Sequence, residues 1–323
     1  MKLSYPVGLI SNSNAKKVRK TIVDSKDLYK LLGGKKYCLL RDTSTLEELK
    51  KVVAEFRDKG INVILSNGGD GTHQKLISTL IHNFRDYSPY IIPLKSGTMN
   101  MLPKNLGLDM SPYKTARWIK DVIEEKTKPS VVVKNILEIK SDSLKRPKYG
   151  FVFLAGCGYK LLNLYYSYPE GGKRSAAKAI VSSMGSWLTK DPLARSIYSY
   201  TPSKTLIDGA EYNFPYLITL VSTLERLVLG FSPFALKSKK QQGFYFMIDG
   251  EPMKKNYKFT KFFKPFPDDE WKSKRLVSRG EKINLEVDGG FSIDGEIINV
   301  SGKAHIEVGM GPGINFITPG IKT

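Results

Sequence analysis

The chain has 323 residues, of which 51 are Lys or Arg and 31 are Asp or Glu, so its formal net charge is +20. With 41% hydrophobic and 11% aromatic residues it can bury a core, which excludes a disordered or collagen-like chain. The excess positive charge is spread along the chain and favours an anionic partner: nucleic acid, an acidic membrane surface or a phosphate-bearing ligand.

The two cysteines, Cys38 and Cys157, are too few for a disulfide framework, and we expect free thiols in a reducing compartment. The first residues contain no long apolar run, so no signal peptide is expected. No stretch approaches the roughly 18 apolar residues that a membrane span needs. These features predict a cytoplasmic protein without a transmembrane segment.

Short apolar strands alternate with helices over residues 1–125. The clearest helix starts with the capping-box spacing of Thr45 and Glu48 and ends at Gly60. Because strands that alternate with helices form parallel sheets, this region predicts a doubly wound α/β domain. The apolar face of the clearest helix is expected to comprise Leu46, Leu49, Val53 and Phe56. Strands are expected at residues 7–10, 37–40, 61–65 and 90–94, and further helices from about residue 15, at 74–81, after residue 98 and from Ser111-Pro112.

The pattern changes after residue 129, where strand-like runs follow one another with few helices between them. This change predicts two domains, an α/β domain at residues 1–129 and a mostly antiparallel β-sandwich at residues 130–323. A Tyr-rich and partly helical insert is expected at residues 159–200. Strands of the second domain are expected at residues 131–140, 148–155, 216–221, 243–248, 282–287 and 314–317.

A glycine-rich segment between a strand and a helix is the sharpest motif, and it reads Asn67-Gly68-Gly69-Asp70-Gly71-Thr72. Glycines let the backbone turn sharply and approach a ligand, and the N–H groups at the start of the following helix favour a phosphate. Asp70 can then hold Mg²⁺, directly or through water, and Thr72 can donate to a phosphate oxygen. Without its context, the same segment is an ordinary βα turn with an Asp cap.

A second polar segment follows the strand at residues 90–94, and its candidate binding residues are Gly97, Thr98 and Asn100. Ser11 and Asn12 follow the first strand, and Thr43 follows the second. In an open α/β sheet, ligands bind outside the carboxyl ends of the strands, so these four segments outline a nucleotide site. Taken singly, each would be a plain turn.

A third motif, Asp294-Gly295-Glu296, lies between alternating apolar residues near the end of the chain. An Asp-Gly pair in such a setting usually forms a hairpin turn. A second Asp-Gly-Glu occurs at residues 249–251. Residues 297–319 read as further strands after residues 294–296.

The three motifs in this order resemble the diacylglycerol-kinase-like lipid kinases, which include bacterial lipid kinases, sphingosine kinases and ceramide kinases. The resemblance extends to Gly156-Cys157-Gly158 and runs nearly end to end. It implies that ATP and Mg²⁺ bind the first domain and the interdomain cleft, with Asp70 at the metal, and that the β domain supplies the lipid side. It favours residues 294–296 over residues 249–251 as the functional copy, because residues 297–319 look like the closing strands of the family. It also implies that Glu296 is the base, while Asp294 orients it or helps to hold the metal through water.

The chain departs from the family at several positions. Gln74 and Lys75 replace the usual Asn and Glu, Met101 replaces an Asp of the second motif, and Lys160 stands where Asp is frequent. A segment matching the accessory metal site of some bacterial members is absent, so that site is not predicted. The missing carboxylate at Met101 leaves substrate identity and full activity open.

Residues 257–266 interleave aromatic residues with lysines, and further basic residues flank them between 254 and 275. This pattern predicts contact with an anionic membrane surface, and it equally suits a β-strand with one buried aromatic face. The leading expectation is therefore an ATP- and Mg²⁺-dependent kinase of a membrane lipid alcohol, cytoplasmic and peripherally membrane-associated.

Three alternatives remain beside the lipid kinase. An NAD-kinase-like enzyme shares the glycine loop, although its usual Asn-x-Gly-x-Leu-Gly-Phe segment is missing here. A catalytically weakened lipid- or nucleotide-binding regulator is suggested by Met101. A nucleic-acid binder is suggested by the charge alone and lacks any recognisable binding module, so nucleic acid is not expected as a partner.

Overall fold

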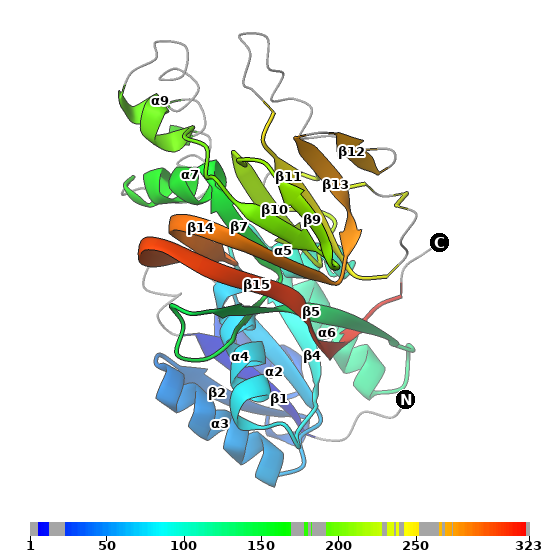
Figure 1. Cartoon of the computed structure of the whole chain (residues 1–323). Helices are drawn as coiled ribbons and strands as arrows, with labels where there is room; N and C mark the ends of the chain where they lie inside the picture. The colour runs from blue at the N-terminus through cyan, green and yellow to red at the C-terminus, as the bar shows by residue number, and fades with distance from the viewer. Residues whose placement is uncertain are drawn as a thin grey trace. The chain divides into compact units, whose positions relative to one another are not determined.

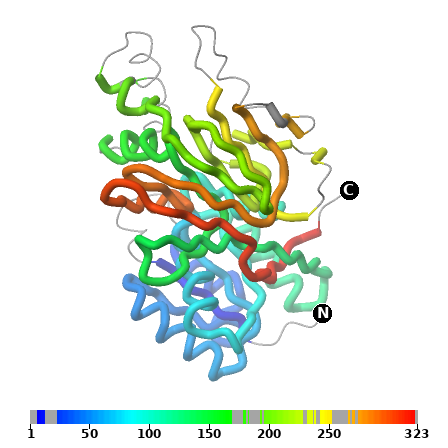
Figure 2. Tube along the Cα trace, in the orientation of Figure 1, coloured from blue at the N-terminus to red at the C-terminus, as the bar shows by residue number. Residues whose placement is uncertain are grey.

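The structure is a computed structural model. The chain forms two compact units (Figure 1). Unit 1 comprises Met1–Asn135 with Pro312–Thr323, and unit 2 comprises Ile136–Gly311. The expected pieces, residues 1–129 and 130–323, differ from these units mainly at the C-terminus, which groups with unit 1. The structure describes residues 6–12, 23–168, 178–179, 182, 192–227, 231–235, 237–238, 242–251, 265–266, 269–272 and 274–320, and the remaining residues are grey in Figure 2.

Unit 1 is built on a parallel sheet, as the sequence predicts. Its strands are β1 (Val7–Asn12), β2 (Cys38–Thr43), β3 (Val63–Gly68) and β4 (Tyr90–Lys95), in the spatial order β2-β1-β3-β4. The end of β15 (Glu296–Thr318) joins β4 in parallel, with Phe316 opposite Ile91. Every residue of β3 is buried, which is typical of a parallel strand covered by helices on both faces.

The helices of unit 1 are α2 (Ser25–Leu31), α3 (Leu46–Asp58), α4 (Asp70–Asn83), α5 (Met101–Asn105) and α6 (Pro112–Ile123), with a 3₁₀ turn at Gly34–Lys36. Right-handed crossovers place α3 and α4 on one face of this sheet and α2 and α6 on the other. The contacts agree, because α3 packs against α4 and α2 against α6 (Figure 1).

The capping box at the start of α3 is confirmed. The Thr45 hydroxyl accepts from the Glu48 amide at 3.1 Å, and the Glu48 carboxylate accepts from the Thr45 amide at 3.3 Å. One residue of the expected apolar face was assigned wrongly, since Leu46 is 44% exposed. Leu46 is the first residue of α3, where the helix has not yet turned onto its neighbours.

Several boundaries differ from the sequence-based expectation. β1 continues through Ser11 and Asn12, which were expected in a turn, and α4 begins at Asp70 instead of residue 74. α2 lies in the region where the sequence predicts a Lys-rich helix from about residue 15, and its first turn is capped by the Asp24 carboxylate, which accepts from the Lys26 amide at 2.9 Å. The expected start of that helix, at residues 13–22, lies outside the described ranges.

Unit 2 is mostly antiparallel, as predicted. Its strands include the second half of β5 (Ser130–Ser141), β6 (Lys148–Gly150), β7 (Val152–Gly156), β8 (Lys204–Ile207), β9 (Ala210–Asn213), β10 (Ile218–Ser222), β11 (Phe244–Asp249), β12 (Glu270–Lys272), β13 (Arg275–Gly280), β14 (Lys282–Ile293) and most of β15. The longest path runs β12-β13-β11-β10-β7-β14-β15. Its main core combines aliphatic residues with aromatic ones, and the ring centroids of Phe153 and Phe291 are 5.6 Å apart.

The third motif forms the turn of a hairpin. β14 and β15 pair with Ile293 opposite Glu296, and the two turn residues, Asp294 and Gly295, both have positive φ angles of 49° and 87°. This geometry is typical of a two-residue type I′ turn, which favours Asp-Gly. The hairpin interpretation of Asp-Gly is therefore confirmed, and Glu296 is the first residue of β15.

The described residues of unit 2 also form the helices α7 (Cys157–Tyr166) and α9 (Pro192–Ile197). Both cysteines are unpaired and buried, as expected, and burial raises the pKa of each thiol to about 12. No helix within the described ranges is long and apolar enough to cross a bilayer.

Candidate functional site

The carboxyl ends of β1, β2, β3 and β4, with the loops that follow them, form one edge of the parallel sheet, which we call the carboxyl rim. The chain runs outward from β1 to β2 in one direction and from β3 to β4 in the other, so the topological switch point lies between β1 and β3. Ligands of doubly wound folds bind at such points. Here the Asn12 amide donates to the Thr72 hydroxyl at 3.1 Å and joins the two sides of the switch point.

Glycines bring two loops of the carboxyl rim into direct backbone contact. A Cβ atom added to Gly97 would lie 2.6 Å from the Gly69 Cα, and one added to Gly68 would lie 2.4 Å from the Thr72 hydroxyl oxygen. Gly71 faces open space instead, with nothing within 4 Å of an added Cβ. Both loops therefore need glycine at these positions, and the backbone beside Gly71 is open to a ligand.

A buried side-chain amide of β3 links β1 to the loop that follows β4, beneath the rim. Asn67 is 1% exposed, donates to the Ser11 hydroxyl at 3.1 Å and accepts from the Ser96 hydroxyl at 2.6 Å. Ser11 is itself fully buried, and Thr43 is 6% exposed opposite Asn12. These side chains hold the rim in shape, and their direct contact with a nucleotide stays a prediction.

The second motif forms a closed loop that is linked to the first. The Gly97 amide donates to the Asn100 side-chain oxygen at 2.8 Å, and the Asn100 amide donates to the Gly97 carbonyl at 2.7 Å. Asp70 accepts from the Leu102 amide at 3.1 Å, so the first turn of α4 is fixed to the start of α5. Met101, which replaces the family's Asp, is the first residue of α5.

The carboxyl rim has features that fit a nucleotide with Mg²⁺. Gly69 is the N-cap of α4 and offers no side-chain cap, while the Thr72 amide donates to the Gly69 carbonyl at 2.8 Å, so the Asp70 and Gly71 amides are the ones suited to an anion. The Thr98 hydroxyl oxygen is buried and has no partner among the described residues. Nowhere in the described part of the chain do three or more His, Cys, Asp or Glu side chains form a metal cluster. Asp70 alone suits Mg²⁺, which usually keeps waters and phosphate oxygens as its other ligands.

His73 lies directly beneath the glycine loop. Its ring is fully buried, and Nδ1 lies 2.9 Å from the Ser66 hydroxyl. Burial lowers the pKa of His73 from 6.5 to about 4, although the nearby Asp70 carboxylate acts in the opposite direction. The imidazole is therefore neutral at pH 7 and forms part of the support for α4.

In unit 2, the Asp294 carboxylate is gripped by backbone amides. It accepts from the Phe151 amide at 2.9 Å and from the Val152 amide at 2.8 Å, while its own amide donates to the Val152 carbonyl at 2.9 Å. Gly150 permits this approach, since an added Cβ would lie 2.2 Å from Ile293 and 3.0 Å from the Asp294 carboxylate. Asp294 thus fixes the hairpin turn against the chain between β6 and β7.

Glu296 emerges from this turn with a largely accessible carboxylate. One oxygen lies 2.8 Å from the Lys148 ammonium, and the Glu296 side chain is 54% exposed. The Tyr166 hydroxyl donates to the Gly295 carbonyl at 2.9 Å. Sequence reasoning missed Lys148 and this contact of Tyr166, because no local pattern links residues so far from the motif.

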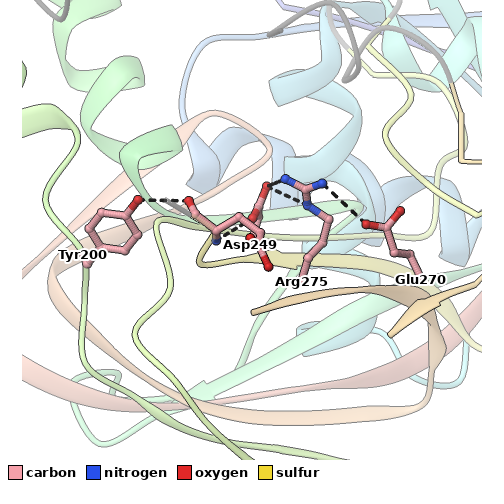
Figure 3. Close-up of polar contacts among 5 residues, drawn as sticks. Tyr200, Asp249, Glu270 and Arg275 are labelled. Carbon is pink, nitrogen blue, oxygen red and sulfur yellow. Dashed lines mark hydrogen bonds and ion pairs between the residues drawn. The ribbon is translucent and has the colours of Figure 1, made fainter. Parts of the chain in front are cut away.

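The second Asp-Gly-Glu is in a different environment (Figure 3). Asp249 is 1% exposed and accepts from two nitrogens of Arg275 at 3.0 and 2.9 Å, and Arg275 also contacts Glu270 at 3.5 Å. The Glu251 amide donates to Asp249, and the Glu251 carbonyl accepts from Tyr200 at 3.0 Å. Asp249 belongs to a buried ion pair, which favours a structural role for this copy.

Other predicted features lie mainly outside the described residues. The aromatic and basic segment proposed to contact a membrane falls mostly on residues 252–264, and only its flanks are described. The central part of the Tyr-rich insert falls outside the described ranges as well. Lys160 is described, and its ammonium donates to the Ser199 hydroxyl while partial burial lowers its pKa.

Comparisons with known proteins agree with the motifs. Residues 6–134 match the family described as the diacylglycerol kinase catalytic domain. Among solved structures, the chain is similar to a diacylglycerol kinase from Bacillus anthracis str. Sterne, with 16% identity, 96% of each chain covered and a TM-score of 0.58. It is also similar to a putative diacylglycerol kinase from the same organism, with 17% identity, the same coverage and a TM-score of 0.60. A search of curated proteins found no match.

The family match lies on unit 1, and it includes the glycine loop and the second motif. The likeness to the Bacillus structures supports the same fold over both units. The resemblance inferred from the motifs is therefore confirmed for the first domain: residues 6–134 match the diacylglycerol kinase catalytic domain, and the Bacillus structures share the fold of the chain.

Proposed function

We propose that the protein is a lipid kinase that uses ATP and Mg²⁺ to phosphorylate the hydroxyl of a diacylglycerol-like alcohol at an anionic membrane surface. The observation that carries the proposal is the contact between Gly69 and Gly97 at the carboxyl rim, within a diacylglycerol kinase catalytic domain. Two loops meet there with no side chain between them, beside the uncapped start of α4.

On the nucleotide side, the chain supplies positioning and charge stabilisation, which are the main requirements of phosphoryl transfer. The amides of Asp70 and Gly71 and the hydroxyls of Thr72 and Thr98 are suited to phosphate oxygens. Asp70 is suited to hold the metal, with its first oxygen anchored by the Leu102 amide. When bound, Mg²⁺ supplies charge neutralisation on the phosphates.

On the acceptor side, Glu296 takes the proton of the lipid hydroxyl. The O–H bond breaks as the oxygen bonds to the γ-phosphorus, and the bond between that phosphorus and the leaving ADP oxygen breaks. Asp294 contributes indirectly, because its two backbone contacts fix the turn from which Glu296 projects. General base catalysis of this kind is worth roughly 10²–10⁴-fold in rate.

The proposal is tested with labelled ATP, Mg²⁺ and vesicles that contain diacylglycerol, phosphatidylglycerol and sphingoid bases in an anionic background. We expect label in the extracted lipid, and the absence of labelled lipid under every condition would refute a lipid kinase. Binding of a fluorescent ATP analogue, measured in parallel, separates a nucleotide-binding regulator from a protein that does not bind ATP.

The two Asp-Gly-Glu copies provide a matched pair of variants. Glu296→Gln should abolish lipid labelling while nucleotide binding persists. Glu251→Gln should leave labelling unchanged, because the hydrogen bonds described for Glu251 use its backbone. The opposite pattern would move the base to residue 251.

A further inference from the structure

One short segment holds both carboxylates of the third motif. The amides of Phe151 and Val152 grip Asp294, and Lys148, three residues before Phe151, contacts Glu296 at 2.8 Å. Lys148 begins β6, where it pairs with Ile139 of β5. The lysine backbone is therefore part of the sheet and provides a fixed attachment point.

The Glu296 carboxylate has little else to fix it. Its side chain is 54% exposed, and Lys148 is its only hydrogen-bonding or ionic partner within the residues that the structure describes. The Lys148 side chain is more shielded, at 33% exposure. An exposed Glu samples many rotamers, and a proton acceptor works only when it is within hydrogen-bond reach of its donor.

The ion pair is too exposed to contribute much to folding stability. Its geometric effect is larger, because it engages one carboxylate oxygen, Oε1, while the second oxygen has no hydrogen bond to a described residue. The turn beneath is held independently, by Asp294 and by the hydroxyl of Tyr166 on the Gly295 carbonyl. Removal of the lysine should therefore free the Glu296 side chain without disturbing the turn.

We propose that Lys148 is a positioning residue that holds the Glu296 carboxylate in the orientation required to accept the proton of the lipid hydroxyl. This inference rests on the proposed function, because it takes Glu296 to be the base. Lys148 is outside the three motifs on which the family resemblance depends, and it acts through Glu296 without taking part in the transfer.

The test compares steady-state lipid phosphorylation by the full chain and its variants. Lys148→Met should lower kcat by about 10–100-fold, the scale of misplacing a reacting group, while KM for ATP and for lipid stays within about twofold. Lys148→Arg keeps the cation and should recover most of kcat. Lys204→Met is the matched control, since Lys204 forms a similar exposed pair with Glu211 at 2.9 Å, and its kcat should equal that of the wild type.

A background variant isolates the contact itself. Glu296→Asp shortens the side chain and so removes the contact with Lys148. In this background, the additional Lys148→Met substitution should lower kcat by less than about twofold relative to Glu296→Asp alone. An equal loss in both backgrounds would show that the lysine acts elsewhere and would overturn the proposal. Unfolding midpoints of all variants verify that they fold, and Lys148→Gln replaces Lys148→Met if the latter does not.

The outcomes separate the inference from the proposed function. If the wild type labels lipid and Lys148→Met has the same or a higher kcat, the positioning role is refuted while the lipid kinase stands. If the wild type labels no lipid although it folds and binds ATP, the proposed function and the role of Lys148 are both refuted.

Discussion

Arg275 provides the sharpest test of the structural assignment of the second Asp-Gly-Glu. Its side chain is 9% exposed and donates two hydrogen bonds, at 3.0 and 2.9 Å, to one oxygen of Asp249 (Figure 3). Arg275→Met removes both donors and leaves the carboxylate buried without its cation. Breaking a buried ion pair from one side costs about 3–5 kcal/mol in the free energy of unfolding.

The lower free energy of unfolding should be visible in urea unfolding and in thermal melts, both followed by circular dichroism and tryptophan fluorescence. A change of 3–5 kcal/mol in a unit of this size lowers the melting temperature by roughly 6–20 °C. The control is Lys204→Met, whose partner Glu211 is 49% exposed, and an exposed pair contributes at most about 1 kcal/mol.

A double variant distinguishes a buried charge from a general packing defect. Asp249→Leu combined with Arg275→Met removes both charges, and it should be more stable than Arg275→Met alone. The reasoning is refuted if Arg275→Met loses less than about 1 kcal/mol, or if the double variant is no more stable than the single one.

Three further predictions concern unit 1. The unfolded chain binds a proton at His73 below pH 6.5, whereas the folded chain does so only near pH 4. The free energy of unfolding should therefore fall by about 3 kcal/mol as the pH drops from 6.5 to about 4. In urea titrations at pH 7, 5 and 4, the free energy of unfolding of His73→Gln should fall less than that of the wild type. The same dependence on pH in both proteins would contradict a neutral, buried His73. Gly97→Ala should cost about 1–3 kcal/mol and weaken ATP binding, because its Cβ would lie 2.6 Å from the Gly69 Cα, and unchanged stability and affinity would exclude this contact. Thr45→Ala should cost about 1 kcal/mol through loss of the cap of α3, measured as a lowered unfolding midpoint, and no change would argue against the capping box.

The features that the sequence predicted depend on residues close together in the chain. The capping box joins Thr45 to Glu48, and the Asp294-Gly295 turn is set by the φ preferences of its own two residues. The order of strands and helices in unit 1 also follows from local periodicity. These elements could be placed without tertiary information.

The features that the sequence did not reveal depend on the register of distant strands. Lys148 is 148 positions from Glu296, and Tyr166 is 129 positions from Gly295. Neither belongs to a motif. Lys148 lies in β6 and Tyr166 in α7, so each contact exists only once its own element is in place beside the hairpin turn. The partnership of Asp249 with Arg275 arises in the same way, from the antiparallel pairing of β11 and β13.

The boundary differences have a simpler cause. Ser11, Asn12 and Asp70 have polar side chains, so hydrophobic patterns end before them, yet backbone hydrogen bonding continues β1 through the first two and starts α4 at the third. Ser11, Asn12 and Asp70, three of the candidate binding residues of the carboxyl rim, are therefore held by regular elements, although the sequence had predicted a turn or loop there.

The central claim is that this chain transfers the γ-phosphoryl group of ATP to a lipid hydroxyl with Glu296 as the base. The most direct measurement is a single-turnover assay with enzyme in excess over labelled ATP, bound with Mg²⁺ and mixed with diacylglycerol vesicles. The wild type should move the label into extracted lipid, and Glu296→Gln should bind the same ATP and transfer it at least about 100-fold more slowly. Equal transfer by both proteins would contradict the assigned base, and no transfer by the wild type to any lipid alcohol would contradict the account as a whole.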